Sequence, residues 1–419
     1  MEATANRAGI VGGGSPATRH ASCVDVAIVG GGIAGITAAF VLAKRGRSVM
    51  LVEAKRYPFH RLCGEFLSPE FDALLAAAGF DVAPMRALGA PIRRTRFTAP
   101  WGRPFADRLP GTALGLSRFA LDAELARQAR AAGVDVLDGE RVRQLERVTA
   151  SADEPSLRVV TDAVTIPCSE VLLATGKLHT EWRRLVSAGT GPDRDEGPLL
   201  GLKQHGTLDG LGDVVEIHAF PGGYCGLNPI EGGRVNVCLI ARTEVFRPHR
   251  TPERFLAWIA GRNRHLGQRL AAFQPLADPI QAVQSHFGTG VVPDDLRPRD
   301  LLLAGDASGM VSPLAGEGMC MAMRAGRVAA ALLDARLQGR LALEPMIELA
   351  RAAEREDKHG LLRLGKLLEA ILFQPVAASA LVSLLALVGP LRRAAIAGTR
   401  KASPALPRAI RSLASEASS

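Results

Sequence analysis

Three glycines near the N-terminus have the spacing of a phosphate-binding turn. Gly30, Gly32 and Gly35 form a GxGxxG pattern within the stretch VGGGIAG. The pattern follows an apolar run over Val24–Val29 and opens a helix-like run over Ala34–Lys44. Glycine is needed there because a Cβ atom would keep backbone N–H groups away from a pyrophosphate, which the positive end of the helix attracts. The pattern predicts a dinucleotide site, with a purely structural glycine turn as the alternative.

A carboxylate follows one strand later. Glu53 ends an apolar strand over Ser48–Val52, where a carboxylate can accept hydrogen bonds from an adenosine ribose. A second glycine-rich stretch, Ala304–Met319, lies far along the chain and reads AGDASGMVSPLAGEGM. We expect a buried strand over Leu301–Ala304 before it and a long helix over Met319–Leu333 after it.

This second stretch resembles the GD motif of the glutathione-reductase-type FAD superfamily. The resemblance implies that Asp306, in the turn Gly305–Asp306, holds the ribityl hydroxyls of FAD. It also implies that the helix beginning after Gly316–Gly318 points its positive end at the pyrimidine edge of the flavin, where reduced flavin carries negative charge. No second GxGxxG follows, so a separate nicotinamide domain is not expected, and NAD(P)H is expected to visit only transiently or to be replaced by a protein donor.

A third segment, Leu116–Leu125, resembles the Arg–Asp segment of the same superfamily. Ser117 and Arg118 precede a helix that contains Asp122 and Gln128. The three segments occur in the order found in the superfamily, so the resemblance implies FAD as the cofactor. The residues that it implies for FAD binding are Gly30, Gly32, Ala34, Gly35, Glu53, Ala54, Arg61, Cys63, Gly64, Arg118, Ala174, Thr175, Gly176, Gly305, Asp306, Pro313, Gly316, Gly318 and Met319.

The segments between these motifs define the expected architecture, an α/β fold. A Rossmann-type FAD-binding domain (residues 23–91, 110–190 and 299–337) is interleaved with an antiparallel-sheet substrate domain (92–109 and 191–298). Alternating patterns over Val214–Ala219 and Arg234–Ile240 suit strands with one buried face. Residues 1–22 are expected to be a flexible leader, and residues 338–419 to form C-terminal helices and a basic tail.

Composition narrows the class of protein. The chain has 419 residues, of which 47% are hydrophobic, and this suffices for large cores. Its six cysteines form no CxxC pair, so we expect no metal site, no disulfide scaffold and a cytoplasmic location. The formal charge of +9 is spread without an aromatic-interleaved basic stripe, so we expect no nucleic-acid partner.

The segment Tyr57–Pro69 runs beside the flavin ring in this superfamily. Its Cys-Gly-Glu, Cys63–Glu65, is similar to the corresponding segment of geranylgeranyl reductases. This makes Cys63 a candidate catalytic or substrate-contacting residue, and a buried structural thiol is the alternative. Tyr224 and Asn228, within GGYCGLNP, are candidates to face the substrate, with a plain turn and strand as the alternative.

Alternation along a strand places Lys203 and His205 on one face of GLKQH. They are the candidate acid–base pair, because a neutral imidazole can take a phenolic proton near pH 7. The alternative is that this face is exposed to solvent.

Two departures from related families bear on the reaction. The Trp-x-Trp-x-x-Pro motif of halogenases is absent. The Asp-Gly pair of many aromatic hydroxylases is replaced in Leu173–His179, LATGKLH, although Gly176 can still approach FAD. The favoured expectation is hydroxylation of a hydrophobic phenolic, polyketide or prenylated substrate with NAD(P)H and O2. The alternatives are reduction of carbon–carbon double bonds, as in geranylgeranyl reductases, and a non-enzymatic electron-transfer flavoprotein.

The C-terminal region combines an uncharged run with a basic one. Ala370–Leu391 has no charged residue, but Gln374 and Pro375 interrupt it, so we expect an interfacial or buried helix rather than a membrane span. The basic residues that follow, against the single acidic Glu416, are Arg392, Arg393, Arg400, Lys401, Arg408 and Arg411. They would attract anionic lipid, so we expect peripheral membrane contact, with a packing helix and a disordered basic tail as the alternative.

Overall fold

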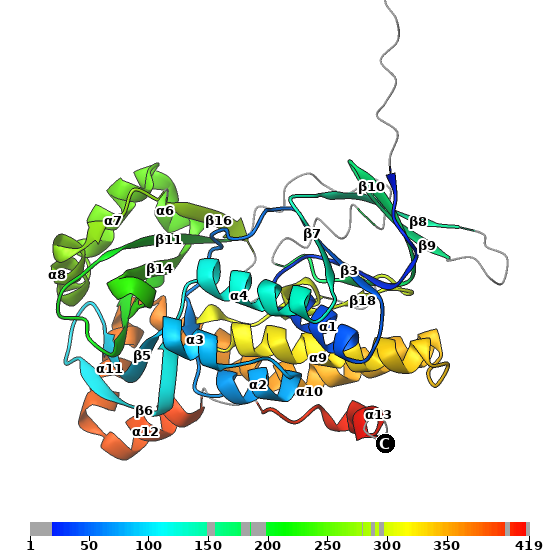
Figure 1. Cartoon of the computed structure of the whole chain (residues 1–419). Helices are drawn as coiled ribbons and strands as arrows, with labels where there is room; N and C mark the ends of the chain where they lie inside the picture. Colours follow the sequence, from blue (N-terminus) through cyan, green and yellow to red (C-terminus); the bar gives the residue numbers. More distant parts are fainter. Residues whose placement is uncertain are drawn as a thin grey trace, which may run out of the picture.

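The computed structural model describes residues 19–148, 156–176, 185, 198–278, 280–285, 290–292, 297–398 and 403–415. These residues form two sheets, with long helices running beneath them (Figure 1). The first sheet is mostly parallel and the second mostly antiparallel. The predicted α/β fold class, with an FAD-type domain, a second sheet and C-terminal helices, is confirmed.

The first sheet has eight strands, with the path β7-β3-β2-β10-β9-β8 and with β1 and β18 paired to β10. Its central strands are parallel because helices connect them, as in dinucleotide-binding folds. The predicted strand Val24–Val29 is β2 with the same bounds. The remaining strands of this sheet are β1 (Arg19–His20), β3 (Val49–Glu53), β7 (Asp135–Asp138), β8 (Val142–Arg147), β9 (Leu157–Thr161), β10 (Val164–Leu173) and β18 (Leu302–Leu303).

Strand β1 falls within the expected leader. Residues Arg19–His20 pair in parallel with β10, so the leader is shorter than predicted at its C-terminal end. The rest of it, residues 1–18, lies outside the described residues, as do residues 177–179 of the stretch LATGKLH.

Close contact between two helices holds the first sheet's main core. The helices α1 (Ile33–Lys44) and α9 (Gly318–Leu337) meet at Gly326, where an added Cβ would lie 2.4 Å from the carbonyl oxygen of Ala34. The same core takes in α2 (Phe71–Ala78), α4 (Arg118–Ala131) and part of α10 (Leu343–Leu372), and the short helix α3 is Ala83–Leu88. Glycine at this crossing therefore sets how closely the two long helices approach.

The second sheet has nine strands, with the path β15-β11-β14-β13-β12-β5-β6-β4 and with β16 paired to β11. Strand β6 continues to Gly115, so this sheet extends beyond the predicted segment 92–109 into residues assigned to the FAD domain. The strands are β4 (Phe66–Leu67), β5 (Ala90–Thr98), β6 (Phe105–Gly115), β11 (Leu199–Thr207), β12 (Val214–Phe220), β13 (Gly223–Pro229), β14 (Val235–Arg242), β15 (Gln274–Pro275) and β16 (Gln281–Ser285). A separate pair joins β17 (Gly290–Val291) to β19 (Gly309–Met310).

Helices cover both faces of the second sheet. One face packs against α7 (Pro252–Ala260) and α8 (Arg264–Ala272), next to the short α6 (Thr243–Phe246). The opposite face packs against α11 (Pro375–Leu387) and α12 (Gly389–Gly398). The cavity described below lies on the α11 side of this sheet.

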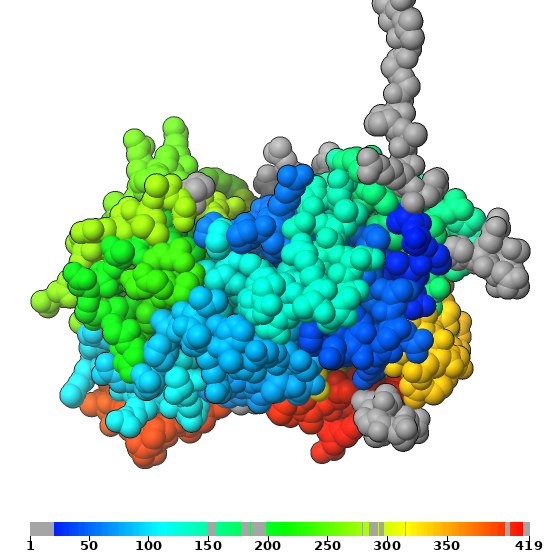
Figure 2. All heavy atoms as spheres, in the orientation of Figure 1, coloured from blue at the N-terminus to red at the C-terminus, as the bar shows by residue number. Residues whose placement is uncertain are grey.

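The chain turns sharply between the last long helices. Among the described helices, none alone is long and apolar enough to cross a membrane. Helices α10 and α11 together meet the length and composition of a membrane span, but the pair is bent by 109° at the predicted break. The end of the chain, including η6 (Arg408–Ile410) and α13 (Arg411–Ser415), lies along the lower edge of the molecule in red (Figure 2).

This last segment is packed rather than disordered, contrary to the alternative given above. Ile410 is fully buried in the main core, and Arg324 of α9 donates to the carbonyl oxygens of Ser403 and Ala405. Arg400, Lys401 and Glu416 lie outside the described residues.

Candidate functional site

One large cavity of about 1030 Å³ lies between the two sheets. Its wall contains every predicted cofactor residue except Gly35, which packs against the backbone of Gly30 instead. Away from the glycine-rich turns the cavity becomes apolar. The residues of this apolar end are Phe97, Phe105, Leu109, Val215, Ile217, Leu368, Leu372, Leu381, Val382, Leu385, Ala395 and Ile396.

The GxGxxG turn has the geometry that a pyrophosphate requires. Gly30 has φ +108°, and an added Cβ there would lie 2.3 Å from the carbonyl oxygen of Ala174. At Gly32 an added Cβ would enter open space, with Arg118 Nη2 as its nearest neighbour at 4.0 Å. The first glycine thus permits the fold, while the second leaves room in the cavity where a phosphate group can approach.

An ion-pair network supports this turn from one side. Glu53 accepts hydrogen bonds from the backbone N–H of Gly31 at 2.8 Å and from Arg61 Nη2 at 2.7 Å. Arg61 Nε also reaches Asp122 at 3.1 Å, and Arg118 Nε donates to Asp122 at 2.7 Å. Glu53, predicted as a ribose ligand, therefore also fixes the phosphate-binding loop.

The GD turn packs against the helix of the first motif, since an added Cβ at Gly305 would lie 2.9 Å from Ala34 Cβ. Gly305 has φ +67°, and Asp306 lies at the cavity wall. Buried Lys358 of α10 holds this turn from behind, donating to the carbonyl oxygen of Gly309 at 2.6 Å and to Ser308 Oγ at 3.0 Å. The buried hydroxyl of Thr175, at the wall, has no hydrogen-bond partner among the described residues.

These features fit FAD. Open glycines, a ribose-type carboxylate, Asp306 and an unpaired hydroxyl line one end of a cavity that the N-terminus of α9 approaches at Gly318. The positive end of a helix and backbone N–H groups are suited to the negative charges of such a cofactor. The residues present therefore match what a bound FAD needs.

The Cys-Gly-Glu segment forms the cavity wall between the cofactor end and the second sheet. Asn236 Nδ2 on β14 holds it by donating to the carbonyl oxygens of Cys63 at 3.1 Å and Gly64 at 2.8 Å. Glu65 has φ 54°, a left-handed conformation that is uncommon for a non-glycine residue. Burial alone would lower the pKa of the Arg118 guanidinium, but Asp122 and the neighbouring Cys63 raise it, so Arg118 stays charged beside the Cys63 thiol.

Glu65 lies at the centre of a buried charged triad. Its Oε1 pairs with Lys203 Nζ, and its Oε2 lies 2.6 Å from His205 Nε2. All three side chains are nearly inaccessible, so the solvent alternative for the Lys203–His205 face is wrong. Burial would raise the pKa of Glu65, but the hydrogen bond to His205 and the charge of Lys203 lower it below its ordinary value.

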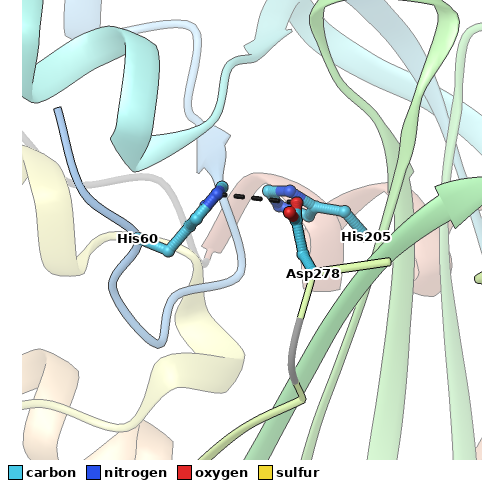
Figure 3. A group of neighbouring side chains, drawn as sticks. All are labelled: His60, His205 and Asp278. Carbon is cyan, nitrogen blue, oxygen red and sulfur yellow. Dashed lines mark ion pairs between the residues drawn. The ribbon is translucent and has the colours of Figure 1, made fainter. Parts of the chain in front are cut away.

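A second histidine links this triad toward solvent. The rings of His60 and His205 lie edge to face at 5.2 Å, and His60 Nε2 lies 3.6 Å from Asp278 Oδ2, which is partly exposed (Figure 3). His60, His205 and Asp278 place three potential ligand atoms within 4.8 Å of one another, a grouping that the sequence analysis did not foresee. Burial, followed by Lys203 and His205, lowers the pKa of His60, so its imidazole is neutral at pH 7.

The other predicted substrate-facing residues are both buried. Tyr224 lines the cavity, and burial raises the pKa of its hydroxyl well above the ordinary value. Asn228 Nδ2 donates to the carbonyl oxygen of Glu65 at 3.3 Å. Tyr224 is thus placed to contact a substrate, and Asn228 both lines the cavity and helps fix the strained residue Glu65.

Sequence reasoning did not assign roles to Glu65, His60, Asp278 or Lys358. Glu65 stands in the Cys-Gly-Glu segment and pairs with the predicted Lys203 and His205, so a search for a carboxylate partner could have found it. Asp278 is brought to His60 by the fold alone, and no local pattern marks it.

Comparisons with known proteins bear on the cofactor and on the fold. A family model described as FAD dependent oxidoreductase matches residues 25–61. "Menaquinone reductase" of Mycolicibacterium smegmatis is 26% identical over 325 residues, covering 74% of this chain and 76% of that protein. "Digeranylgeranylglycerophospholipid reductase 2" of Methanothermobacter thermautotrophicus is 28% identical over 336 residues, covering 75% and 80%.

Solved structures show the same fold at lower identity. A geranylgeranyl bacteriochlorophyll reductase-like protein from Thermoplasma acidophilum has a TM-score of 0.69 at 18% identity, covering 94% of this chain and 96% of its own. PqsL of Pseudomonas aeruginosa, a probable FAD-dependent monooxygenase, has a TM-score of 0.65 at 20% identity, covering 86% and 99%. The resemblance stated from the sequence is confirmed: the chain is an FAD-dependent oxidoreductase, similar in fold to a geranylgeranyl bacteriochlorophyll reductase-like protein and to a probable FAD-dependent monooxygenase.

Proposed function

We propose that this chain reduces carbon–carbon double bonds in the isoprenoid chain of a lipid, using bound FAD. The observation that carries the proposal is the apolar end of the cavity, where residues from six elements, β5, β6, β12, α10, α11 and α12, meet. Such a wall suits a long hydrocarbon chain, because burying it gains roughly 25 cal/mol per Å² of apolar surface. Menaquinone and digeranylgeranylglycerophospholipid, the substrates named for the two relatives above, are both polyisoprenoid lipids, which supports this choice.

The proposed reaction adds two electrons and two protons to one double bond, as one hydride and one proton. Reduced FAD supplies a hydride when it is bound. The chain must then supply a proton, exclude water and hold the double bond in place. Cys63 Sγ is the group that we assign to the proton, because it lies at the cavity wall beside the charged Arg118.

Each reduced double bond consumes a proton from solvent, and the triad offers a path for it. Asp278 is partly exposed, neutral His60 lies next to it, and His205 bridges His60 to the Glu65 carboxylate. The backbone N–H of Glu65 lies 3.4 Å from Cys63 Sγ, so the triad ends next to the assigned proton donor. We assign this series of side chains to proton resupply.

Hydroxylation of a hydrophobic phenolic, polyketide or prenylated substrate with NAD(P)H and O2 is the second candidate. The buried Glu65–His205 pair favours it, because a hydroxylase for phenols needs a base that takes the phenolic proton. The stacked rings of Phe97 and Phe105, 5.1 Å apart at the cavity wall, would also suit an aromatic substrate.

Product mass separates the two candidates. The holoenzyme would be reduced with dithionite under nitrogen and mixed with menaquinone or a geranylgeranylated glycerol lipid in detergent. Double-bond reduction predicts a mass increase of 2 that survives exposure to air, whereas a reduced quinone ring reoxidises to its starting mass. Because dithionite reduces the FAD directly, the result does not depend on whether the physiological electron donor is NAD(P)H or a protein.

The parallel reaction under 18O2, with NAD(P)H and phenolic, polyketide or prenylated compounds, tests the second candidate. Suppose that the product of this reaction contains one labelled oxygen atom and that the lipid in the first reaction shows no air-stable mass increase of 2. This result would overturn the reductase proposal in favour of hydroxylation. Unchanged lipids in both reactions, with FAD bound and reducible, would also overturn it. Such an outcome would favour the electron-transfer alternative.

A further inference from the structure

We propose that the outer face of α11, with the β5–β6 hairpin tip beside it, docks the protein on an anionic lipid bilayer. The observation that points to it is that α11 is apolar on both of its sides. Its inner side buries Ala378, Val382 and Leu385 against the second sheet. Its outer side leaves Val376 and Leu387 71% and 72% exposed.

An ordinary surface helix has an apolar stripe toward the core and polar residues on the other side. Helix α11 has no charged residue at all, and the exposed Val376, Leu384 and Leu387 recur at the spacing of one helical face. Val388, at the end of α11, and Leu391, in the first turn of α12, are also exposed. Leaving such a contiguous apolar surface in water is costly, so it marks a surface that contacts something else.

The hairpin between β5 and β6 adds an aromatic anchor to this face. Trp101 is 60% exposed, and its backbone N–H donates to Ser379 Oγ of α11 at 3.2 Å. The backbone N–H of Arg103 donates to Ser383 Oγ at the same distance, so the tip is fixed beside the helix. We call Trp101, Val376, Leu384, Leu387, Val388 and Leu391 the docking patch. Tryptophan is enriched at membrane–water interfaces because its ring is amphipathic.

Charge favours a lipid surface as the occupant of the docking patch. The residues of α11 and α12 include no acidic side chain. Arg393, in α12, and Arg103, in the β5–β6 hairpin, are both exposed. Arg392 is held in place by Asp107 at 2.7 Å. A basic residue near an anionic bilayer contributes attraction, while a bilayer interior accepts the apolar residues between.

The location of the patch fits this occupant. Figures 1 and 2 show α12, in orange, at the lower edge of the molecule next to the cyan β5–β6 region. Helices α11 and α12 separate the patch from the apolar end of the cavity, because Leu381, Val382, Leu385 and Ile396 line that end. The inference does not need the proposed reaction, since binding to a bilayer is measured without turnover.

The test uses the full-length holoprotein, because the packed C-terminal segment makes a truncation unsuitable. Protein is mixed with vesicles of phosphatidylcholine and phosphatidylglycerol at low salt, and the bound fraction is measured by flotation. We expect the wild type to bind and Leu384→Asp/Leu387→Asp to bind at least tenfold less. Leu88→Asp is the matched control, because Leu88 is also a half-exposed leucine, 49% exposed, but lies on α3.

Two measurements keep a negative result meaningful. FAD absorbance and the melting temperature of the double variant must equal those of the wild type, which is expected because both leucines are exposed. A shift of the Trp101 emission to shorter wavelength on vesicle addition, lost in Trp101→Phe, places the hairpin tip in the interface.

Three results would overturn the inference. Equal binding of wild type and double variant, or no binding by either, would remove lipid as the occupant. If the wild type forms a dimer and does not bind vesicles, and the double variant is a monomer, the docking patch would be assigned to self-association instead. Binding that survives carbonate washing would contradict peripheral docking and indicate insertion of the bent α10–α11 pair.

Discussion

Gly30 and Gly32 are two residues apart, yet a side chain would act differently at each position. The valine of Gly32→Val would enter the open cavity, so we expect a folded protein that has lost most of its FAD. The valine of Gly30→Val would collide with Ala174 at a backbone angle that valine disfavours, so we expect loss of folding as well. FAD absorbance per chain and far-ultraviolet circular dichroism measure the two effects. Full FAD content in folded Gly32→Val would contradict the cofactor site.

Cys63 lies at the cavity wall beside the charged guanidinium of Arg118. Replacement by serine keeps the size but raises the cost of proton loss at this position. We expect Cys63→Ser to retain FAD and to lose about tenfold or more in turnover, equivalent to about 1.4 kcal/mol of transition-state stabilisation. Cys23→Ser serves as the control because Cys23 is exposed, and it should change neither quantity. An unchanged rate in Cys63→Ser would return Cys63 to a structural role.

The contact between α1 and α9 carries the cofactor turns on rigid helices. Gly326→Ala would press a methyl group against Ala34 and Thr37, so we expect a loss of about 1–3 kcal/mol in the free energy of unfolding. Weaker FAD binding should accompany it, since α1 and α9 begin at the two cofactor motifs. Urea unfolding of the apoprotein and FAD titration measure these changes. Gly398→Ala, in open space at the end of α12, should change neither.

Strand β12 and helix α8 are joined by a buried ionic cluster. Glu216 accepts from Arg269 Nη2 at 2.7 Å and lies 3.1 Å from His218 Nε2. Burial would raise the pKa of Glu216, but its hydrogen bonds with His218 and Arg269 lower it from 4.5 to about 2. The stability due to this carboxylate is therefore fully present above pH 4.5 and is lost as the pH falls toward about 2.

Thermal unfolding between pH 6 and pH 3 tests this linkage. Glu216→Gln should melt at a lower temperature than the wild type at pH 6, and the difference should narrow as the pH falls below 4.5. A difference that stays constant over the whole range would show that Glu216 does not titrate as stated.

Local elements were the easiest to predict from the sequence. The GxGxxG turn, the Asp306 turn and α9 follow from glycine spacing and apolar runs, which depend on neighbouring residues only. The Glu65 triad was only half predicted. Alternation along β11 placed Lys203 and His205 on one face, but which carboxylate they meet depends on how residues 63–65 fold across the second sheet. The contact of Asp278 with His60 depends wholly on tertiary structure.

At the scale of the whole molecule, the end of the chain returns to the core of the FAD-binding part. Ile410 is fully buried there, and Arg324, 6% exposed, gains two carbonyl partners from residues 403–405. We expect Ile410→Ala to cost about 2–5 kcal/mol in the free energy of unfolding, as for other fully buried side chains. Denaturant unfolding measures it, with Leu88→Ala as an exposed control expected to change by less than about 0.5 kcal/mol. A loss no larger than that of the control would show that the segment only rests on the surface.

The cofactor end of the cavity is lined by segments that lie far apart in the sequence, and this has a consequence for how the protein is made. Gly30 and Glu53 leave the ribosome early, whereas Asp306, Gly318 and the supporting Lys358 emerge only after the second sheet has been synthesised. A nascent chain that ends before Gly305 has the GxGxxG turn but neither the Asp306 turn nor helix α9, which packs on α1. Capture of FAD is therefore expected only after the second sheet, the Asp306 turn and α9 have all been synthesised.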